Sequence, residues 1–233
     1  MRNQPERNCA GWLFLVNSEE NIVSAKKMIL LPVLFFFLAT CAPKNDRPPN
    51  IIYIMTDDLG YGDLGCYGQD MIKTPNIDQL ASEGIRFTDH YSGHTVCRPS
   101  RLVLWTGRHS GHTAIAANEP YVFQPEDVTV AELLKSSGYV TGGVGKWAMA
   151  DADGNGHPND NGFDFWMGYL NQSNAHNYYP LYLWKNREKV ALKGNVLYDE
   201  DGRNRGRVTK ERAVWSHEVM TNAALDFIRN NAE

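Results

Sequence analysis

The sequence has few of the features that would place it outside the ordinary globular proteins. It has only four cysteines in 233 residues, too few for a disulfide scaffold, and their spacing matches no zinc-binding pattern. It has no excess of basic residues, and its net charge of −4 and pI near 6.0 give no sign of a nucleic-acid-binding surface. A composition of 42% hydrophobic and 21% charged residues, without internal repeats, excludes disordered, collagen-like and coiled-coil chains.

An apolar run at residues 28–39 is too short for a transmembrane helix, which needs about 20 residues. It directly follows Lys26 and Lys27, and it leads into small residues, an order that is typical of a secretory signal. A buried core helix is the alternative. Pro32 within the run and the polar residues that follow it argue against that helix.

The run ends at Leu38-Ala39-Thr40-Cys41, which resembles a bacterial lipobox, whose cysteine is lipidated and becomes the mature N-terminus. Simple cleavage is the alternative, since threonine before the cysteine is less usual than glycine, alanine or serine. We expect residues 1–41 to be an upstream extension plus this signal and residues 42–49 to be a solvated tether. The remainder, 50–233, is then exported, either to the periplasm or to a bacterial membrane through lipid on Cys41.

The exported part alternates expected strands with expected helices. The strands are residues 50–55, 85–91 and 139–144, of which the first is a near-continuous apolar run typical of a buried central strand. The helices are 75–83, 99–105, one from a Thr129/Glu132 capping box to Gly138, and one from about Ser216 with Val219, Ala223 and Phe227 on its apolar face. This order predicts an α/β domain with a mostly parallel sheet flanked by helices on both faces. Ligands of such a domain bind beyond the carboxyl ends of the strands.

Two adjacent carboxylates, Asp57 and Asp58, follow the first expected strand. Carboxylates at the end of a buried strand repel each other and lose solvation, so they need a cation or a basic partner. All-oxygen ligation suits a hard ion such as Ca²⁺ or Mg²⁺. The alternative is an aspartate pair that caps a turn.

A second set of reactive side chains lies in Cys97-Arg98-Pro99-Ser100-Arg101. With Pro99 as the first helical residue, Cys97 lies at the positive end of a helix dipole, where free N–H groups favour an anion. Arg101 can direct its guanidinium at the same anion. The alternative is a buried free cysteine beside a surface arginine.

From residue 50 onward the sequence resembles the N-terminal part of a type I, formylglycine-dependent sulfatase, an arylsulfatase-like member of the alkaline phosphatase superfamily. Several motifs occur in the family's order. They are Asp57-Asp58, Thr74-Pro75-Asn76-Ile77-Asp78 with Leu80-Ala81 and Gly84, Cys97-x-Pro99-Ser100-Arg101, Thr106-Gly107-Arg108 and Gly145-Lys146-Trp147.

The resemblance implies that a maturation enzyme oxidises Cys97 to formylglycine, whose hydrated form attacks the sulfur of a sulfate ester. It implies that Asp57, Asp58 and the modified residue 97 bind a divalent cation, Ca²⁺ rather than Mg²⁺, which neutralises developing charge together with Arg101. Lys146 matches the family lysine that contacts the sulfate group or the leaving-group oxygen. The family often has a histidine two residues later, where this sequence has Ala148.

Other chemistry-bearing residues have weaker interpretations. His176 is a candidate for facing the substrate, and the aromatics at 178–184 either stack on sugar rings or pack a small core. His94 is expected to support the Cys97 loop, and Cys66 to be structural. Asp151-x-Asp153-x-Asn155-Gly156 copies half of an EF-hand loop, but Gly162 stands where a bidentate glutamate is needed, so a polar turn is expected.

These observations predict a sulfuric ester hydrolase that acts on sulfated small molecules or glycans and depends on a maturation enzyme. The alternatives are a phosphonate or phosphate ester hydrolase of the same superfamily and a truncated, non-catalytic lipoprotein. No nucleic-acid partner is expected, and the membrane is met only through the lipid anchor. The sequence stops at Glu233, where the family continues into a second metal-ligand pair, a second lysine and a histidine, so we expect residues 50–233 alone to be a poor enzyme.

Overall fold

The computed structural model describes residues 48–150, 156–198 and 209–232. The expected lipidation site Cys41, most of the 42–49 tether and the EF-hand-like Asp151, Asp153 and Asn155 lie outside these ranges. The chain divides into two compact units, 1–52 and 53–233, and all the elements below belong to the second. None of the helices in the described ranges has the length and apolar character that crossing a bilayer requires.

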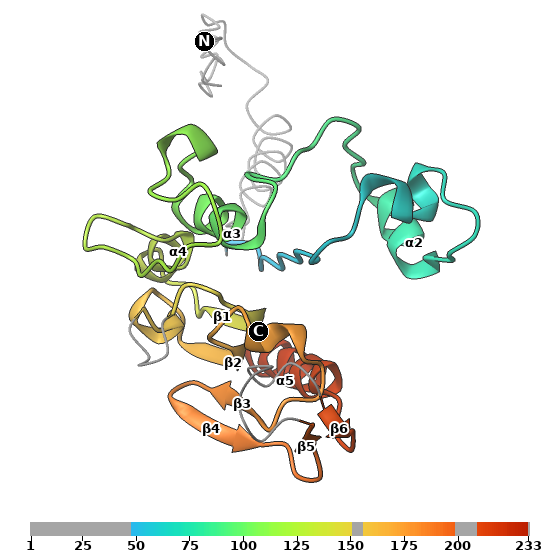
Figure 1. The fold of residues 1–233 in the computed structure, drawn as a ribbon. Helices are drawn as coiled ribbons and strands as arrows, with labels where there is room; N and C mark the ends of the chain where they lie inside the picture. Colours follow the sequence, from blue (N-terminus) through green and yellow to red (C-terminus); the bar gives the residue numbers. More distant parts are fainter. Residues whose placement is uncertain (1–47, 151–155, 199–208, 233) are drawn as a thin grey trace, which may run out of the picture. The chain divides into compact units, whose positions relative to one another are not determined.

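In the described residues of the larger unit, three α-helices come first, six short strands follow, and one more α-helix comes last (Figure 1). The helices are α2 (Pro75–Glu83), α3 (Cys97–Thr106), α4 (Val130–Ser136) and α5 (Ser216–Asn231). The strands are β1 (Gly142–Lys146), β2 (Phe165–Tyr169), β3 (Tyr182–Lys185), β4 (Glu188–Ala191), β5 (Val196–Leu197) and β6 (Thr209–Glu211).

Strands β1 to β4 form one sheet in the order β1-β2-β3-β4, and β5 pairs with β6 separately. β1 and β2 are parallel, with Lys146 opposite Tyr169, so both strands end at the same edge of the sheet. β2, β3 and β4 are joined in antiparallel pairs. The expected α/β class is confirmed, and the sheet in the described residues is mixed, because β3 and β4 form a hairpin.

Alternate residues of β2 face opposite sides of the sheet, as the two-residue period of a strand requires. Trp166 packs in a cluster with Leu102 of α3 and Ala131 of α4. Met167 and Tyr169 belong to a second cluster, against which α5 packs. Helices therefore cover both faces of the sheet, as the sequence predicts.

The last helix packs on the sheet through its expected apolar face. Val219 and Ala223 lie against the second cluster, and the ring of Phe227 stacks on Phe165 with centroids 5.5 Å apart. The Phe227 ring also occupies the space beside Gly142, since a Cβ added to this glycine would lie 2.5 Å from the ring. The glycines of β1 thus permit a close approach of α5 to the strand.

Trp147, the residue directly after β1, is completely buried and lies at the centre of an aromatic cluster. Its ring centroid lies between 5.3 and 5.7 Å from the rings of Trp105, Phe123, Phe163 and Trp166. Its indole N–H donates to the Gly156 carbonyl at 2.7 Å, so its one polar atom is also satisfied. Trp105 therefore has a packing role in this cluster.

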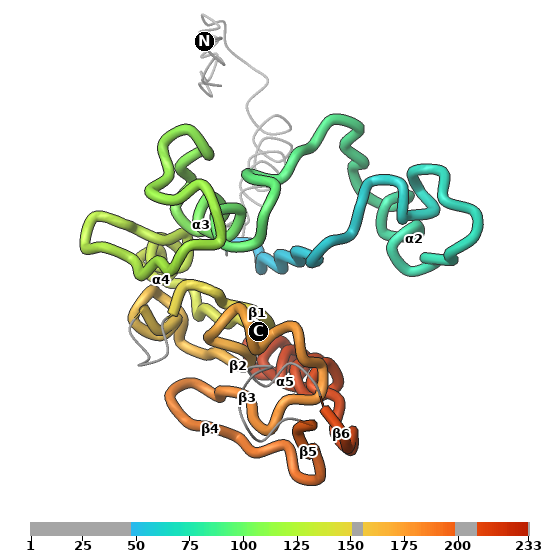
Figure 2. The backbone as a smooth tube through the Cα atoms, in the orientation of Figure 1, coloured from blue at the N-terminus to red at the C-terminus, as the bar shows by residue number. Residues whose placement is uncertain are grey.

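Two expected strands do not form. Residues 50–55 and 85–91 form no strand in the described part of the chain (Figure 2). Their apolar side chains are exposed, as Ile54 at 79% and Ile85 at 83% show. A buried strand is held by hydrogen bonds to neighbours on its edges. Here those bonds have no partner strand among the described residues, so apolar character alone did not produce a strand.

The other expected elements form with small shifts of their ends. The capping box is present, since Thr129 Oγ1 accepts from the Glu132 N–H at 3.1 Å and Glu132 accepts from the Thr129 N–H at 2.7 Å. The expected 139–144 strand is β1, displaced towards the C-terminus, and the expected 99–105 helix begins at Cys97. The 75–83 helix and the helix from Ser216 start where the sequence predicts.

A substitution at Gly168 tests the parallel pairing of β1 and β2, which determines the position of Lys146. This glycine lies opposite Gly145, and a Cβ on Gly168 would lie 2.0 Å from the Gly145 carbonyl oxygen. We expect Gly168→Ala to lower the free energy of unfolding by about 2 kcal/mol or more, because a backbone atom cannot move aside cheaply. Denaturant unfolding measures this. Gly62→Ala is the control, since nothing lies within 4 Å of its added Cβ, and an equal loss in both variants would contradict the clash.

Candidate active site

Cys97 is the first residue of α3, after Val96 in extended conformation. Pro99 is therefore the third helical residue, not the first as expected. The Arg98 N–H donates to Asn118 Oδ1 at 3.0 Å, and proline has no N–H. Of the first three backbone positions of α3, only Cys97 thus has an amide without a partner in the described residues. The dipole argument for an anion holds, but with fewer free donors than the sequence suggested.

Arg101 lies one turn further along α3 and is only 7% exposed. Its Nη1 donates to the Lys146 carbonyl at 2.5 Å, and its Nη2 lies 3.8 Å from Asp57 Oδ1. Its Nε is buried and has no hydrogen-bond partner in the described part of the chain. A buried donor without a partner is costly, so this atom indicates a place where an anionic ligand would be stabilised.

Lys146 ends β1 and directs its ammonium group at Asp57. The Nζ lies 2.5 Å from Asp57 Oδ2, and the lysine side chain is 7% exposed. The strand and the buried Trp147 fix the lysine backbone on either side. Two cationic side chains from different elements, α3 and β1, therefore meet at one carboxylate.

Asp57 is held ionised by these neighbours. Burial raises its pKa, but the hydrogen bond from Lys146 and the charges of Lys146, Arg101 and His176 outweigh this, so the pKa lies below its ordinary 3.8. Burial lowers the pKa of Arg101, whereas Asp57 and Cys97 act in the opposite direction. Arginine nevertheless stays protonated in proteins, so the site carries two fixed positive charges around one negative charge.

Asp58 is exposed, as Asp57 is, and its backbone is left-handed with φ of 57°. No three His, Cys, Asp or Glu side chains gather as metal ligands among the described residues. Asp57 and Asp58 do offer the oxygen donors that hard cations prefer, so they fit such an ion by donor type and would supply part of its coordination.

Arg98 is a buried residue of this region that the sequence did not identify. Its Nε donates to the Ala148 carbonyl at 2.8 Å, and its Nη1 donates to the carbonyls of Asn118 and Glu119. It thereby joins the start of α3 to the segment that follows Lys146. Ala148 is itself completely buried with φ of 72°, so it offers no side chain to the site in place of the family histidine. Nothing in the sequence around Arg98 indicates that this arginine is buried.

The two candidate histidines occupy different positions. His176 is exposed at the end of a short 3-10 helix, Asn174–His176, and its charge acts on Asp57. It therefore interacts with Asp57 only through its charge, and it forms no hydrogen bond to Asp57 or Lys146 in the described structure. His94 Nδ1 accepts from the Val96 N–H at 3.4 Å, which agrees with a supporting role for this loop before Cys97.

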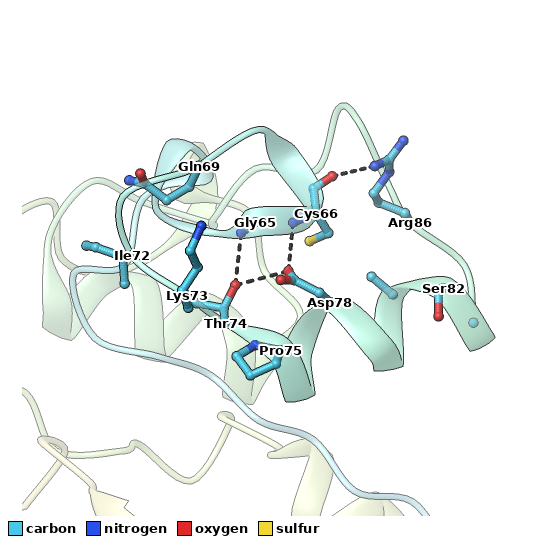
Figure 3. A pocket seen from close by; sticks show the side chains of 12 residues that line it. Gly65, Cys66, Gln69, Ile72, Lys73, Thr74, Pro75, Asp78, Ser82 and Arg86 are labelled. Carbon is cyan, nitrogen blue, oxygen red and sulfur yellow. Dashed lines mark hydrogen bonds between the residues drawn. The ribbon is translucent and has the colours of Figure 1, made fainter.

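A separate hollow of about 790 Å³ lies beside α2 (Figure 3). Its polar atoms satisfy one another, because Thr74 Oγ1 accepts from the Gly65 N–H and Asp78 Oδ1 accepts from both Thr74 and the Cys66 N–H. Neither Asp57, Cys97, Arg101 nor Lys146 lines it.

Cys66 and Cys97 are both free thiols. They do not form a disulfide with each other, which would have made Cys97 unavailable for reaction.

The lowered pKa of Asp57 predicts a pH-dependent contribution to stability. A carboxylate whose folded pKa is depressed stabilises the fold above its unfolded pKa, and this contribution is lost as the pH falls through the folded value. We therefore expect wild type to be more stable than Asp57→Asn at pH 7 and the difference to shrink below pH 4. Urea unfolding across this range measures it. Asp70→Asn, which removes an exposed carboxylate without an ion pair in the described part, should show a smaller change.

A family model described as Sulfatase matches residues 49–233. Human arylsulfatase D is 45% identical over 158 residues, 59% of this chain and 27% of its own length. The N-acetylglucosamine-6-O-sulfatase of Bacteroides thetaiotaomicron is 30% identical over 223 residues, 94% of this chain and 35% of its own. The chain thus spans about a quarter to a third of the length of these curated relatives.

Solved structures give the same result. A structure described as a complex with its substrate D-glucosamine-2-N,6-O-disulfate aligns with a TM-score of 0.61 and 29% identity, over 79% of this chain and 32% of that one. A 6S-sulfatase from a Bacteroides thetaiotaomicron study of glycosaminoglycan metabolism aligns with a TM-score of 0.62 and 27% identity, over 78% and 48%. With its motifs, its α/β fold and its matched family model, the chain belongs to the sulfatase family.

Proposed function

We propose that this chain carries the nucleophile-bearing part of a sulfuric ester hydrolase that acts on sulfated glycans. The observation that supports it most is the buried Arg101, whose Nε has no partner among the described residues and whose guanidinium lies beside both Lys146 and Asp57. Two buried cations next to the start of a helix suit a tetrahedral oxyanion. Relatives named as N-acetylglucosamine and N-acetylgalactosamine 6-O-sulfatases support a glycan as the substrate class.

Residue 97 is the proposed nucleophile. When a maturation enzyme has oxidised Cys97 to formylglycine, its hydrated aldehyde supplies a hydroxyl nucleophile that no unmodified side chain provides. Its place as the first residue of α3 keeps it on a rigid element, one turn from Arg101. Arg101 then binds anionic oxygens of the ester through Nε, while its Nη1 remains bonded to the Lys146 carbonyl.

Lys146 is the proposed donor to the leaving-group oxygen. Its ammonium group is paired with Asp57 and largely shielded from water, so a sulfate ester that enters the site competes with Asp57 for this donor. A charge-assisted hydrogen bond in a water-poor site stabilises developing negative charge more strongly than it would in water. The exposed His176, whose charge acts on Asp57, is proposed to face the substrate.

Asp57 and Asp58 are the proposed holders of a divalent cation, Ca²⁺ rather than Mg²⁺. When bound, such an ion neutralises charge on the ester oxygens. A cation would also compete with Lys146 and Arg101 for Asp57, which would free both cationic side chains for the substrate. Asp58 is exposed, so its carboxylate is accessible to an ion.

We further propose that the protein is exported in bacteria and anchored through a lipid on Cys41. The basic, apolar and small-residue order of residues 26–41 supports this. Lipidation would hold the catalytic domain at a membrane by a tether of residues 42–49. More than one acyl chain, or a second membrane contact, is needed for the anchoring to be stable. Metabolic labelling with a lipid precursor, compared with a Cys41→Ala variant, tests the assignment.

The nucleophile is tested by replacing Cys97. In the complete natural chain produced with a maturation enzyme, the peptide that contains residue 97 should have a lower mass than the unmodified cysteine peptide. Cys97→Ala should reduce hydrolysis of 4-nitrophenyl sulfate by about a thousandfold or more, because the nucleophile is lost. Cys66→Ala is the matched control, since Cys66 lines the separate hollow beside α2.

Retained sulfatase activity in Cys97→Ala would overturn the assignment of the nucleophile. Phosphate and phosphonate esters should be assayed beside the sulfate ester. Faster turnover of either would show that the reaction class is wrong although the nucleophile is right.

The cation is tested with Asp58→Asn and a chelator. Chelation should lower kcat/KM by about a hundredfold, and Ca²⁺ should restore it at lower concentration than Mg²⁺. Asp58→Asn should raise the Ca²⁺ concentration needed for half-maximal activity. Asparagine tolerates the left-handed backbone at this position, so the free energy of unfolding should change by less than about 0.5 kcal/mol. Activity that survives chelation unchanged contradicts the metal assignment.

A further inference from the structure

An exposed tyrosine lies in a segment whose backbone is unusually well held. Tyr178 is 65% exposed, although the residue before it, Asn177, is 4% exposed. The Tyr178 carbonyl accepts from both the backbone N–H and the hydroxyl of Ser216, at 2.9 and 2.8 Å. Exposed loop residues are usually mobile, so a fixed backbone beneath an exposed ring needs a reason.

Buried polar side chains hold the residues on either side of Tyr178. Asn177 Oδ1 accepts from the Tyr179 N–H at 2.9 Å and from Thr209 Oγ1 at 2.8 Å. Thr209 Oγ1 also lies 2.8 Å from the Tyr179 carbonyl. Such a network of satisfied buried groups rigidifies a segment. The aromatic ring of Tyr178 is therefore presented to solvent in a preorganised position.

The same segment is joined to the end of the sheet that carries Lys146. Tyr169 is the register partner of Lys146, and its hydroxyl lies 2.7 Å from both the Asn177 carbonyl and Ser216 Oγ. Burial raises the pKa of Tyr169 to about 12, so this hydroxyl stays a neutral donor at physiological pH. The exposed Tyr178 ring is thus positioned from the strand edge at which the candidate active site lies.

A second exposed aromatic residue comes from the start of α5. Trp215 is 45% exposed and precedes Ser216, which is bonded to Tyr178. The His217 ring lies 5.0 Å from the Trp215 ring, and the exposed Arg212 guanidinium lies 5.7 Å from the Tyr179 ring. The bonds of Ser216 thus hold together two segments, one with the exposed ring of Tyr178 and the other with the ring of Trp215 and the positive charge of Arg212.

We propose that Tyr178 and Trp215 form a sugar-binding subsite beside the active site, which stacks on a pyranose ring of a sulfated glycan next to the ring that carries the reacting ester. The inference rests on the proposed function and extends it to a substrate of more than one sugar. Aromatic rings offer large apolar faces at low conformational cost, as flat, weakly polar sugar faces require. Arg212 adds the charge complementarity that a second sulfate group needs.

The test compares substrates of different length in the complete natural chain, matured at residue 97. The substrates are 6-O-sulfated glucosamine and galactosamine oligosaccharides and the corresponding sulfated monosaccharides. The measured quantity is the ratio of kcat/KM for an oligosaccharide to that for its monosaccharide. We expect Tyr178→Ala and Trp215→Ala each to lower this ratio by about tenfold, mainly through KM, because stacking on the second ring is lost.

Tyr178→Phe is the matched control, since it keeps the ring face and should keep the ratio within about twofold of wild type. Thermal unfolding of each variant checks that the fold is retained. Binding of the oligosaccharide to the Cys97→Ala protein, followed by calorimetry, gives the same comparison without turnover, and Tyr178→Ala should weaken it by about tenfold.

The possible results separate the two proposals. If wild type hydrolyses none of these esters, the proposed function fails. If it hydrolyses them but the ratio and the calorimetric affinity are the same in wild type, Tyr178→Ala and Trp215→Ala, the subsite is wrong. A change of oligomeric state in Trp215→Ala with an unchanged ratio would also overturn the subsite, because the surface would then be a protein interface.

Discussion

The burial of Trp147 is the constraint on which the rest of this site depends. Its indole is completely enclosed by four other rings and lies directly after Lys146 in the chain. Because packed rings cannot shift without opening a cavity, the backbone at the carboxyl end of β1 is fixed. From this fixed backbone the Lys146 side chain reaches Asp57, whose Oδ2 lies 2.5 Å from its Nζ.

Electrostatics then determines how the fixed side chains are arranged. Lys146 and Arg101 are both largely buried, and isolated buried charges are strongly unfavourable. Asp57 compensates them in the described structure, and in doing so it shields the groups that an anionic substrate would use. A substrate or a cation that takes over one of these contacts exchanges one ion pair for another, so binding need not leave a buried charge unpaired. The site can therefore exchange the Asp57 ion pairs for ion pairs with a substrate or a cation.

Hydrogen bonds connect this centre to its surroundings on two sides. Arg98 joins the start of α3 to the carbonyl of Ala148, and the Tyr169 hydroxyl joins the end of β2 to the segment before α5. Both side chains are buried and act on backbone atoms or buried hydroxyls. Cys97, Lys146 and the segment that carries Tyr178 therefore lie on elements that these hydrogen bonds connect. A loop without such bonds could not keep an exposed ring at a fixed place.

The sequence alone indicated the family and the α/β class, predicted the four described α-helices to within a few residues, and singled out Asp57, Cys97, Arg101 and Lys146 as candidate site residues. These follow from local patterns such as capping residues, helical periodicity and ordered motifs, which need no distant contact. Only the tertiary structure decided that residues 50–55 and 85–91 form no strand in the described part of the chain, because strand formation depends on partners remote in the chain. It likewise decided that Arg98 is buried and that Asp57 is the partner of Lys146 and Arg101. Burial and ion pairing are properties of side chains brought together from separate elements, and no local pattern encodes them.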